Sequence, residues 1–134
     1  MCKKFVLLLV GMYLPLNMGL TKEELEVLGE QLHSTCVSKT GVSEDLILAV
    51  NEDKTFADDE NLKCYIKCVM QEGGVMDDEG LIDPAAAREI IPEEYDSDHE
   101  LLLRSCSSKK GSTTCETAWL AHKCYAQHPQ YRLL

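Results

Sequence analysis

The chain has 134 residues and a formal net charge of −10, from 23 acidic and 13 basic side chains. This length suits one domain with a single hydrophobic core. So acidic a surface repels phosphate groups, which argues against nucleic acid and anionic lipid headgroups as partners, and solubility in extracellular fluid explains the acidity best.

The first 19 residues have the layout of a secretory signal peptide. Lys3 and Lys4 form a short basic start, residues 5–16 are almost wholly apolar, and Gly19 supplies the small residue expected near a cleavage point. The apolar stretch is too short to span a bilayer and no later segment does so, so stable membrane insertion is not expected. Losing two lysines takes the net charge from −10 to −12 in the secreted domain, residues 20–134.

Cleavage also removes Cys2, and the six remaining cysteines predict three disulfides in an oxidising compartment. Cys64 and Cys68 lie four residues apart on a predicted helix. They cannot comfortably bond to each other, because a disulfide needs Cβ atoms about 4 Å apart and this helical spacing gives roughly 5–6 Å. Cys115 and Cys124 would lie about 13.5 Å apart along one helix. Excluding both pairs leaves ten of the fifteen possible connectivities open.

Hydrophobic residues recur at helical spacing along the mature chain, and no stretch shows the alternation of a strand. Capping residues precede these segments, and glycine or proline ends most of them. We expect six helices, which run from Thr21 to Gly41, from Ser43 through Val50, from about Asn61 to Gly73, from Pro84 to Ile91, from Asp96 or Ser97 to Cys106, and from Thr113 to Pro129. Residues 51–60 are predicted to form a polar loop. The expected fold class is all-α, a compact bundle of about six helices cross-linked by three disulfides.

Other chemistry is less favoured. Cys-x3-Cys together with His122 or His128 could supply zinc ligands, but an even number of cysteines in a secreted chain favours disulfides, so no metal site is expected. The acidic turn at residues 77–80 lacks the ligand spacing of a calcium loop. No hydrolase, metalloprotease or nucleotide-binding motif occurs, so neither enzymatic activity nor a cofactor is expected. His33 and His99 have charged neighbours and are expected at the surface.

The cysteine spacing is the most specific feature of the sequence. It reads Cys36-x27-Cys64-x3-Cys68-x37-Cys106-x8-Cys115-x8-Cys124. This framework resembles the six-cysteine signature of insect odorant-binding proteins, which include the pheromone-binding proteins, and it covers the whole mature chain. Leu62-Lys63-Cys64-Tyr65 and His122-Lys123-Cys124 are similar to segments common in that family.

The resemblance implies six helices around an apolar cavity and the interlocked bridges Cys36–Cys68, Cys64–Cys115 and Cys106–Cys124, a pairing among the ten left open. It also implies a carrier that takes small hydrophobic ligands, odorants or pheromones, through sensillum lymph or another extracellular fluid. An olfactory receptor and a weak homodimer are the further partners considered. The alternative is a secreted interaction or toxin-like protein on the same scaffold, with no small-molecule carrier role.

The lining of the pocket has to be predicted from the apolar residues of this chain. We expect a pocket of roughly 300–600 Å³ that holds a molecule of about ten to twenty heavy atoms. The candidate ligand-binding residues are Ala87, Ile91, Tyr95, Leu102, Trp119, His122, Tyr125, Tyr131, Leu133 and Leu134. Ordinary core packing is the competing role for each of them, and it is the preferred role for Trp119 and His122.

The five residues after Pro129 form a short tail with three apolar side chains. We expect it to fold back as a wall or lid of the pocket, since burying about 200–300 Å² of apolar surface offsets the entropy lost in ordering it. His122 and His128 lie close to its hinge and are expected to titrate between pH 5 and 8, so acidification should loosen the tail and lower affinity. A disordered tail without a role is the alternative.

Overall fold

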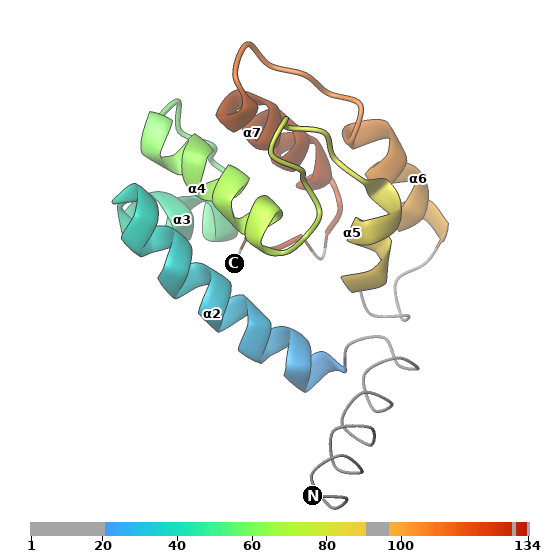
Figure 1. Cartoon of the computed structure of the whole chain (residues 1–134), viewed down its shortest axis with the longest axis horizontal. Helices are drawn as coiled ribbons and strands as arrows, with labels where there is room; N and C mark the ends of the chain where they lie inside the picture. Colours follow the sequence, from blue (N-terminus) through green and yellow to red (C-terminus); the bar gives the residue numbers. More distant parts are fainter. Residues whose placement is uncertain (1–20, 91–96, 130, 134) are drawn as a thin grey trace, which may run out of the picture.

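The computed structural model describes residues 21–90, 97–129 and 131–133. These residues contain six helices (Figure 1): α2 (Lys22–Thr40), α3 (Glu44–Asp53), α4 (Glu60–Glu72), α5 (Pro84–Ile90), α6 (Ser97–Cys106) and α7 (Thr114–Tyr125). They contain no β-strand, and Met76 and Ile82 form only an isolated bridge. The predicted all-α fold is confirmed. The predicted signal peptide lies outside the described residues, and none of the described helices has the length and apolar character needed to cross a membrane.

Side-chain caps determine where three of the helices begin. Thr21 and Thr113 each accept a hydrogen bond from the backbone N–H of the glutamate three residues later, both at 3.1 Å. Ser43 accepts one from the N–H of Asp45 at 3.3 Å. Gly41 ends α2 with a φ of 70°, a left-handed conformation that glycine adopts without strain. The predicted starts of these helices are confirmed.

The predicted polar loop at residues 51–60 is wrong at its start and agrees with the structure to within one residue at its end. α3 continues to Asp53, and α4 already begins at Glu60. The extra turn of α3 ends at Lys54, which has a φ of 53° and donates its backbone N–H to the carbonyl of Val50 at 3.0 Å. Contacts with a distant part of the chain hold this turn in place, and such contacts override its polar composition.

α4 lies at the centre of the bundle, beside α2 and α7 (Figure 1). Three disulfides tie the helices together: Cys36–Cys68 joins α2 to α4, Cys64–Cys115 joins α4 to α7, and Cys106–Cys124 joins α6 to α7. The Cα atoms of these pairs lie 5.6, 4.6 and 5.4 Å apart. The pairing that the family resemblance implies is confirmed, and the two cysteines of α4 reach different helices, as their spacing required.

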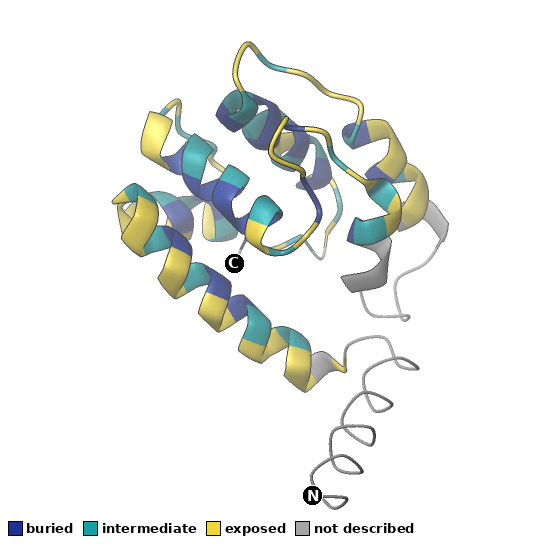
Figure 2. Cartoon of the chain, viewed as in Figure 1, coloured by how far each residue is buried: buried dark blue, intermediate teal, exposed yellow. Residues whose placement is uncertain are grey.

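All six described helices contribute to the hydrophobic core, and α4 contributes more of its buried residues than any other helix (Figure 2). The core face of α4 presents Leu62, Tyr65 and Ile66, which are completely buried. α7 opposes it with Ala118 and Ala121, which are also completely buried. Small alanine side chains let the backbone of α7 come close to the bulky face of α4, and the two faces fill the space between the helices.

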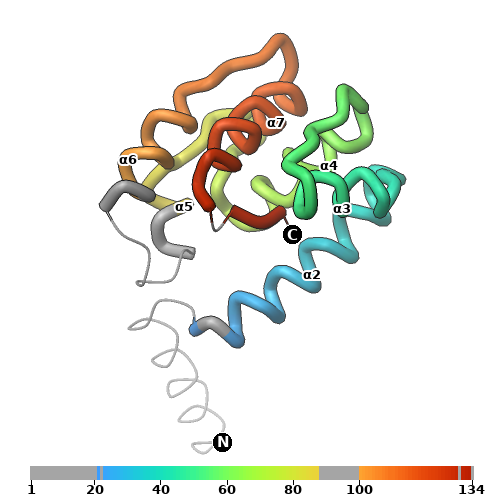
Figure 3. The backbone as a smooth tube through the Cα atoms, turned by 180° about the vertical axis from the view of Figure 1, so that it is seen from behind, coloured from blue at the N-terminus to red at the C-terminus, as the bar shows by residue number. Residues whose placement is uncertain are grey.

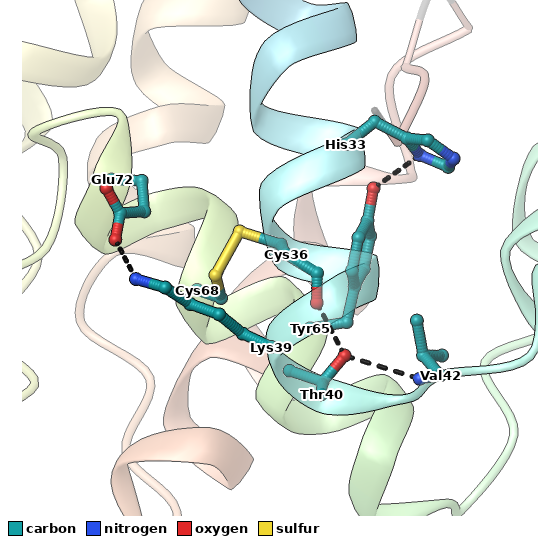
Figure 4. The surroundings of a disulfide bond; sticks show 8 residues. All are labelled: His33, Cys36, Lys39, Thr40, Val42, Tyr65, Cys68 and Glu72. Atoms are coloured by element: carbon teal, nitrogen blue, oxygen red, sulfur yellow. Dashed lines mark hydrogen bonds and ion pairs between the residues drawn. A yellow bond between two sulfur atoms is a disulfide. The ribbon is translucent and has the colours of Figure 1, made fainter.

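His33 joins three helices and its side chain is 31% exposed, so the expected surface position is confirmed only in part. Its Nδ1 lies 2.9 Å from the hydroxyl of Tyr65 in α4 (Figure 4), and its Nε2 lies 2.9 Å from a carboxylate oxygen of Glu44 in α3. Burial raises the pKa of Tyr65, so its hydroxyl keeps its proton at neutral pH. The Cys36–Cys68 disulfide lies one turn further along α2, so a covalent and a polar link connect this helix to α4. The side chain of His99 lies outside the described part.

Candidate functional site

The tail after α7 folds back over the bundle and reaches α3 (Figure 3). Leu133 is only 2% exposed and belongs to the hydrophobic core. Asn51 of α3 forms two hydrogen bonds with the backbone of this residue. Its amide nitrogen donates to the carbonyl of Leu133 at 3.0 Å, and the N–H of Leu133 donates to Asn51 Oδ1 at 2.7 Å. The predicted folding back of the tail is confirmed for residues 131–133.

Lys54 holds the start of the tail from the end of α3. Its ammonium group donates to the backbone carbonyls of Ala126 and His128, the latter at 3.1 Å. These carbonyls lie where α7 ends, and the end of a helix leaves such acceptors without partners inside the helix. A positive charge is also favourable at this end of a helix. Asn51 and Lys54 therefore hold the tail at two points, and we call this pair the α3 clamp.

His122 links α7 to the tail. Its Nδ1 lies 2.7 Å from the hydroxyl of Tyr131, and its ring stands edge-on to the rings of Tyr125 and Tyr131, with centroids 5.2 and 5.7 Å away. Burial lowers the pKa of His122 to about 4 and raises the pKa of Tyr131. At neutral pH the imidazole is neutral and the phenol holds its proton, so the hydroxyl donates to Nδ1 when the ring proton is on Nε2.

The expectation that His122 titrates between pH 5 and 8 is therefore wrong. The ring is surrounded by aromatic side chains and loses its hydration, which disfavours the imidazolium. Protonation of His122, and any loosening of the tail that follows from it, is expected only near pH 4.

Tyr125 and Phe56 complete an aromatic cluster at this junction. The hydroxyl of Tyr125 lies 2.9 Å from that of Ser107, just after α6, and burial raises the pKa of Tyr125. The ring centroid of Phe56 lies 6.2 Å from that of Tyr131. We call the four rings the tail cluster: Phe56, His122, Tyr125 and Tyr131. The fold thus brings together three of the predicted ligand-binding residues, and Leu133 follows in the same tail.

Trp119 of α7 packs against the core as a partly buried residue. The ammonium groups of Lys63 and Lys123 lie 4.5 and 4.4 Å from the centroid of its ring. Its Nε1 is buried and has no hydrogen-bond partner among the described residues. Both lysines attract the ring through cation–π interactions. A ligand contact for Trp119 stays a prediction.

The other candidate residues lie in the core or outside the described part of the chain. Ala87 of α5 is 6% exposed and belongs to the core, and Leu102 of α6 is partly buried against it. Ile91, Tyr95 and Leu134 lie outside the described residues. Contact with a ligand stays a prediction for all ten candidates.

A pocket of about 440 Å³ opens between α5 and α6. Among the described residues, its lining consists of Asp83, Pro84, Ala85, Glu100, Leu103 and Arg104. Leu103 is only 6% exposed, and it belongs to the hydrophobic core as well as to this lining. Those of the ten candidates that the structure describes do not line this pocket, so we describe it separately as the α5–α6 crevice.

Glu60, Cys64 and Cys115 come close enough to resemble a metal site, with possible ligand atoms within 4.8 Å of one another. The two cysteines are bonded to each other as a disulfide, however, so neither sulfur is a thiolate. Because metal ions bind the thiolate form of cysteine, this set of donors does not fit a metal.

The α3 clamp was missed by sequence reasoning. Asn51 and Lys54 fall in the stretch that composition assigned to a loop, and neither belongs to a motif or to an apolar periodicity. The backbone that Asn51 holds is 82 residues away in the sequence. No local pattern could indicate that contact.

Comparison with known proteins agrees with this fold. The model of the PBP/GOBP family matches residues 19–128. General odorant-binding protein 69a of Drosophila melanogaster is 30% identical over 95 residues, which cover 71% of this chain and 64% of that relative, slightly less than two thirds of its length.

Two solved structures show the same arrangement of helices. The Locusta migratoria odorant binding protein lmigOBP1 has a TM-score of 0.70 at 34% identity, over 83% of this chain and 85% of that one. Odorant Binding Protein 7 from Anopheles gambiae, with four disulfide bridges and in complex with an azo compound, has a TM-score of 0.68 at 28% identity, over 81% and 87% of the two chains. The chain belongs to the PBP/GOBP family, the odorant-binding proteins that its cysteine spacing resembles.

Proposed function

We propose that the protein is a secreted carrier that holds a small hydrophobic molecule of the odorant or pheromone class inside its helical bundle. The observation that carries this proposal is the family match over residues 19–128, together with the complete framework of three disulfides. The complex of the Anopheles gambiae protein with an azo compound supports the binding of a small organic molecule. Carriage requires burial of the ligand and no bond chemistry.

The tail cluster is the part of the binding site that the geometry supports best. Its four rings come from α7, the tail and the segment before α4, and such a wall buries apolar surface. The Nδ1 of His122 is already bonded to Tyr131, so the wall has few polar groups for a ligand. Affinity should therefore rest on apolar burial and lie in the micromolar range, about −8 kcal/mol.

Competition binding tests the proposal. Alcohols, esters, aldehydes and terpenoids should displace a fluorescent apolar probe from the oxidised, signal-free protein. A probe that does not bind, or that no member of the panel displaces, would overturn the carrier function.

Variants in the tail test the site itself. Deleting residues 130–134 should weaken probe binding about tenfold, because the wall loses Tyr131 and Leu133. Leu101→Gln is the matched control, since Leu101 is 66% exposed on α6, and it should leave affinity unchanged. A truncated protein that binds as tightly as the full chain would remove the tail from the site.

Secretion is a separate part of the proposal. When the full chain is expressed in insect cells, the protein in the medium should begin near residue 20 and contain no free thiol. Intact-mass measurement with and without thiol alkylation reports both properties. Protein retained in the cells with residues 1–19 still attached would contradict it.

A further inference from the structure

We infer that the ligand reaches the interior through the α5–α6 crevice, by displacement of α5, and not past the tail. This inference rests on the proposed carrier function, because it assigns the route by which that function loads and releases its ligand. Three independent features of the molecule support it.

The first feature is the crevice itself. Its volume of about 440 Å³ can admit a molecule of the proposed size, and it is open to solvent. The buried side chain of Leu103 belongs to its lining and also to the core. An apolar molecule in the crevice is therefore separated from the core by the layer of side chains that α5 and α6 provide.

The second feature is the distribution of restraints. α2, α4, α6 and α7 each carry at least one cysteine that takes part in a bridge, and α3 is bonded to the tail through Asn51 and Lys54. α5 contains no cysteine, so no disulfide holds it. Its buried contribution within residues 84–87 is Ala87, a small side chain. No covalent bridge therefore has to break for α5 to move away from α6.

The third feature is the closed alternative at the tail. The tail is held by the reciprocal bonds of Asn51, by the two bonds of Lys54 and by the contact between His122 and Tyr131. Opening a passage there would break these bonds together and expose Leu133. The tail is therefore better suited to form a fixed wall of the site than a movable entrance for the ligand.

The charges around the crevice favour passage over retention. Glu100 and Arg104 lie 3.7 Å apart at its edge, and the carboxylate of Asp83 also lines it. Hydrated charged groups at the mouth bind an apolar molecule only weakly, whereas the core beyond Leu103 offers it apolar contacts. The route suits neutral ligands, and a carboxylate ligand would have to pass Asp83 and Glu100.

The experiment tethers α5 to α6 and measures exchange of N-phenyl-1-naphthylamine by stopped flow. Ala85→Cys and Glu100→Cys place exposed thiols on either side of the crevice, and a short bis-maleimide joins them. Association and release should both slow about tenfold or more with affinity within about twofold, because a tether changes the path and leaves the bound state intact. The same double variant capped with N-ethylmaleimide controls for the added bulk.

A tether at the tail is the matched comparison. Thr55→Cys and Gln127→Cys place exposed thiols beside Lys54 and beside the carbonyls that it holds, and the same reagent should leave both rates unchanged. Ala85→Phe narrows the crevice without thiol chemistry and should also slow both rates. It carries the test if the double variant fails to form its three native disulfides.

The outcomes are distinct. Unchanged rates in the tethered protein and in Ala85→Phe would overturn the inference, and slowing by the tail tether alone would move the route to the tail. If the wild-type protein does not bind the probe at equilibrium, the carrier function fails and this inference fails with it. If the wild type binds the probe but the α5–α6 tether changes neither exchange rate, only the proposed route is wrong.

Discussion

The two sides of this small bundle are held in different ways. On the side of α4, α7 and the tail, disulfides, a buried aromatic cluster and the α3 clamp connect segments that are far apart in the sequence. On the side of α5 and α6, one bridge holds α6, and a pocket of about 440 Å³ opens between the two helices. The proposed carrier function needs a bundle that is stable and still exchanges its ligand. Concentrating the restraints on one side allows both.

Removing disulfides should show the difference between the sides most strongly. Replacing Cys64 and Cys115 by serine frees a bridge between residues 51 apart, and the loop-entropy relation predicts a loss of about 4 kcal/mol of unfolding free energy. Replacing Cys106 and Cys124 frees a bridge between residues 18 apart and should cost about 3 kcal/mol. Urea unfolding of both double variants against the wild type provides the comparison. The reverse order would mean that the α6 side carries more of the stability than the structure indicates.

The pH dependence of stability tests the buried state of His122. The folded protein keeps this ring neutral down to about pH 4, whereas in the unfolded chain it takes up a proton near its ordinary pKa of 6.5. Between these values the unfolded state binds more protons, so the unfolding free energy falls as the pH falls. The loss from this one group over the window is about 3 kcal/mol.

His122→Gln should remove this part of the pH dependence. Glutamine cannot take up a proton, and its carbonyl can still accept the hydroxyl of Tyr131. Urea unfolding at pH 7 and pH 4 should therefore show a smaller drop for the variant than for the wild type, while the carboxylates contribute to both proteins alike. Equal drops in the two proteins would mean that the folded protein does not lower the pKa of His122.

The α3 clamp should have the smallest effect of the three. Asn51→Ala removes both hydrogen bonds to Leu133 and should lower the unfolding free energy by about 2 kcal/mol. Asn51→Asp keeps the acceptor for the N–H of Leu133 but loses the donor to its carbonyl, so its loss should be intermediate. Carboxypeptidase should also trim the tail faster in the alanine variant. Trimming at the wild-type rate would show that other contacts suffice to hold the tail.

Much of the framework could be predicted from the chain alone. The caps at Thr21, Ser43 and Thr113 are local interactions between residues close in sequence, and the structure contains each of them. The i,i+4 spacing of Cys64 and Cys68 required two different partners, because helical geometry is the same in every helix. The family resemblance implied which cysteines these partners are, and the three bridges confirm that pairing.

Other features depend on neighbours that the sequence cannot name. The last turn of α3 reads as a polar loop until Asn51 and Lys54 meet the tail, and His33 reads as a surface residue until Tyr65 and Glu44 reach it. His122 has an ordinary pKa in any local context, and only the rings around it lower that pKa to about 4.

By itself, then, the sequence determined the helices, their caps and the cysteine spacing that relates the chain to the odorant-binding proteins. These features follow from interactions within a few residues or from a spacing that can be counted along the chain. The tertiary structure alone decided the clamp on the tail, the neutral state of His122 and the crevice beside α5. Each of these depends on which segments the fold brings together across the bundle. The burial and the hydrogen bonds of a side chain are determined only once those segments are in contact.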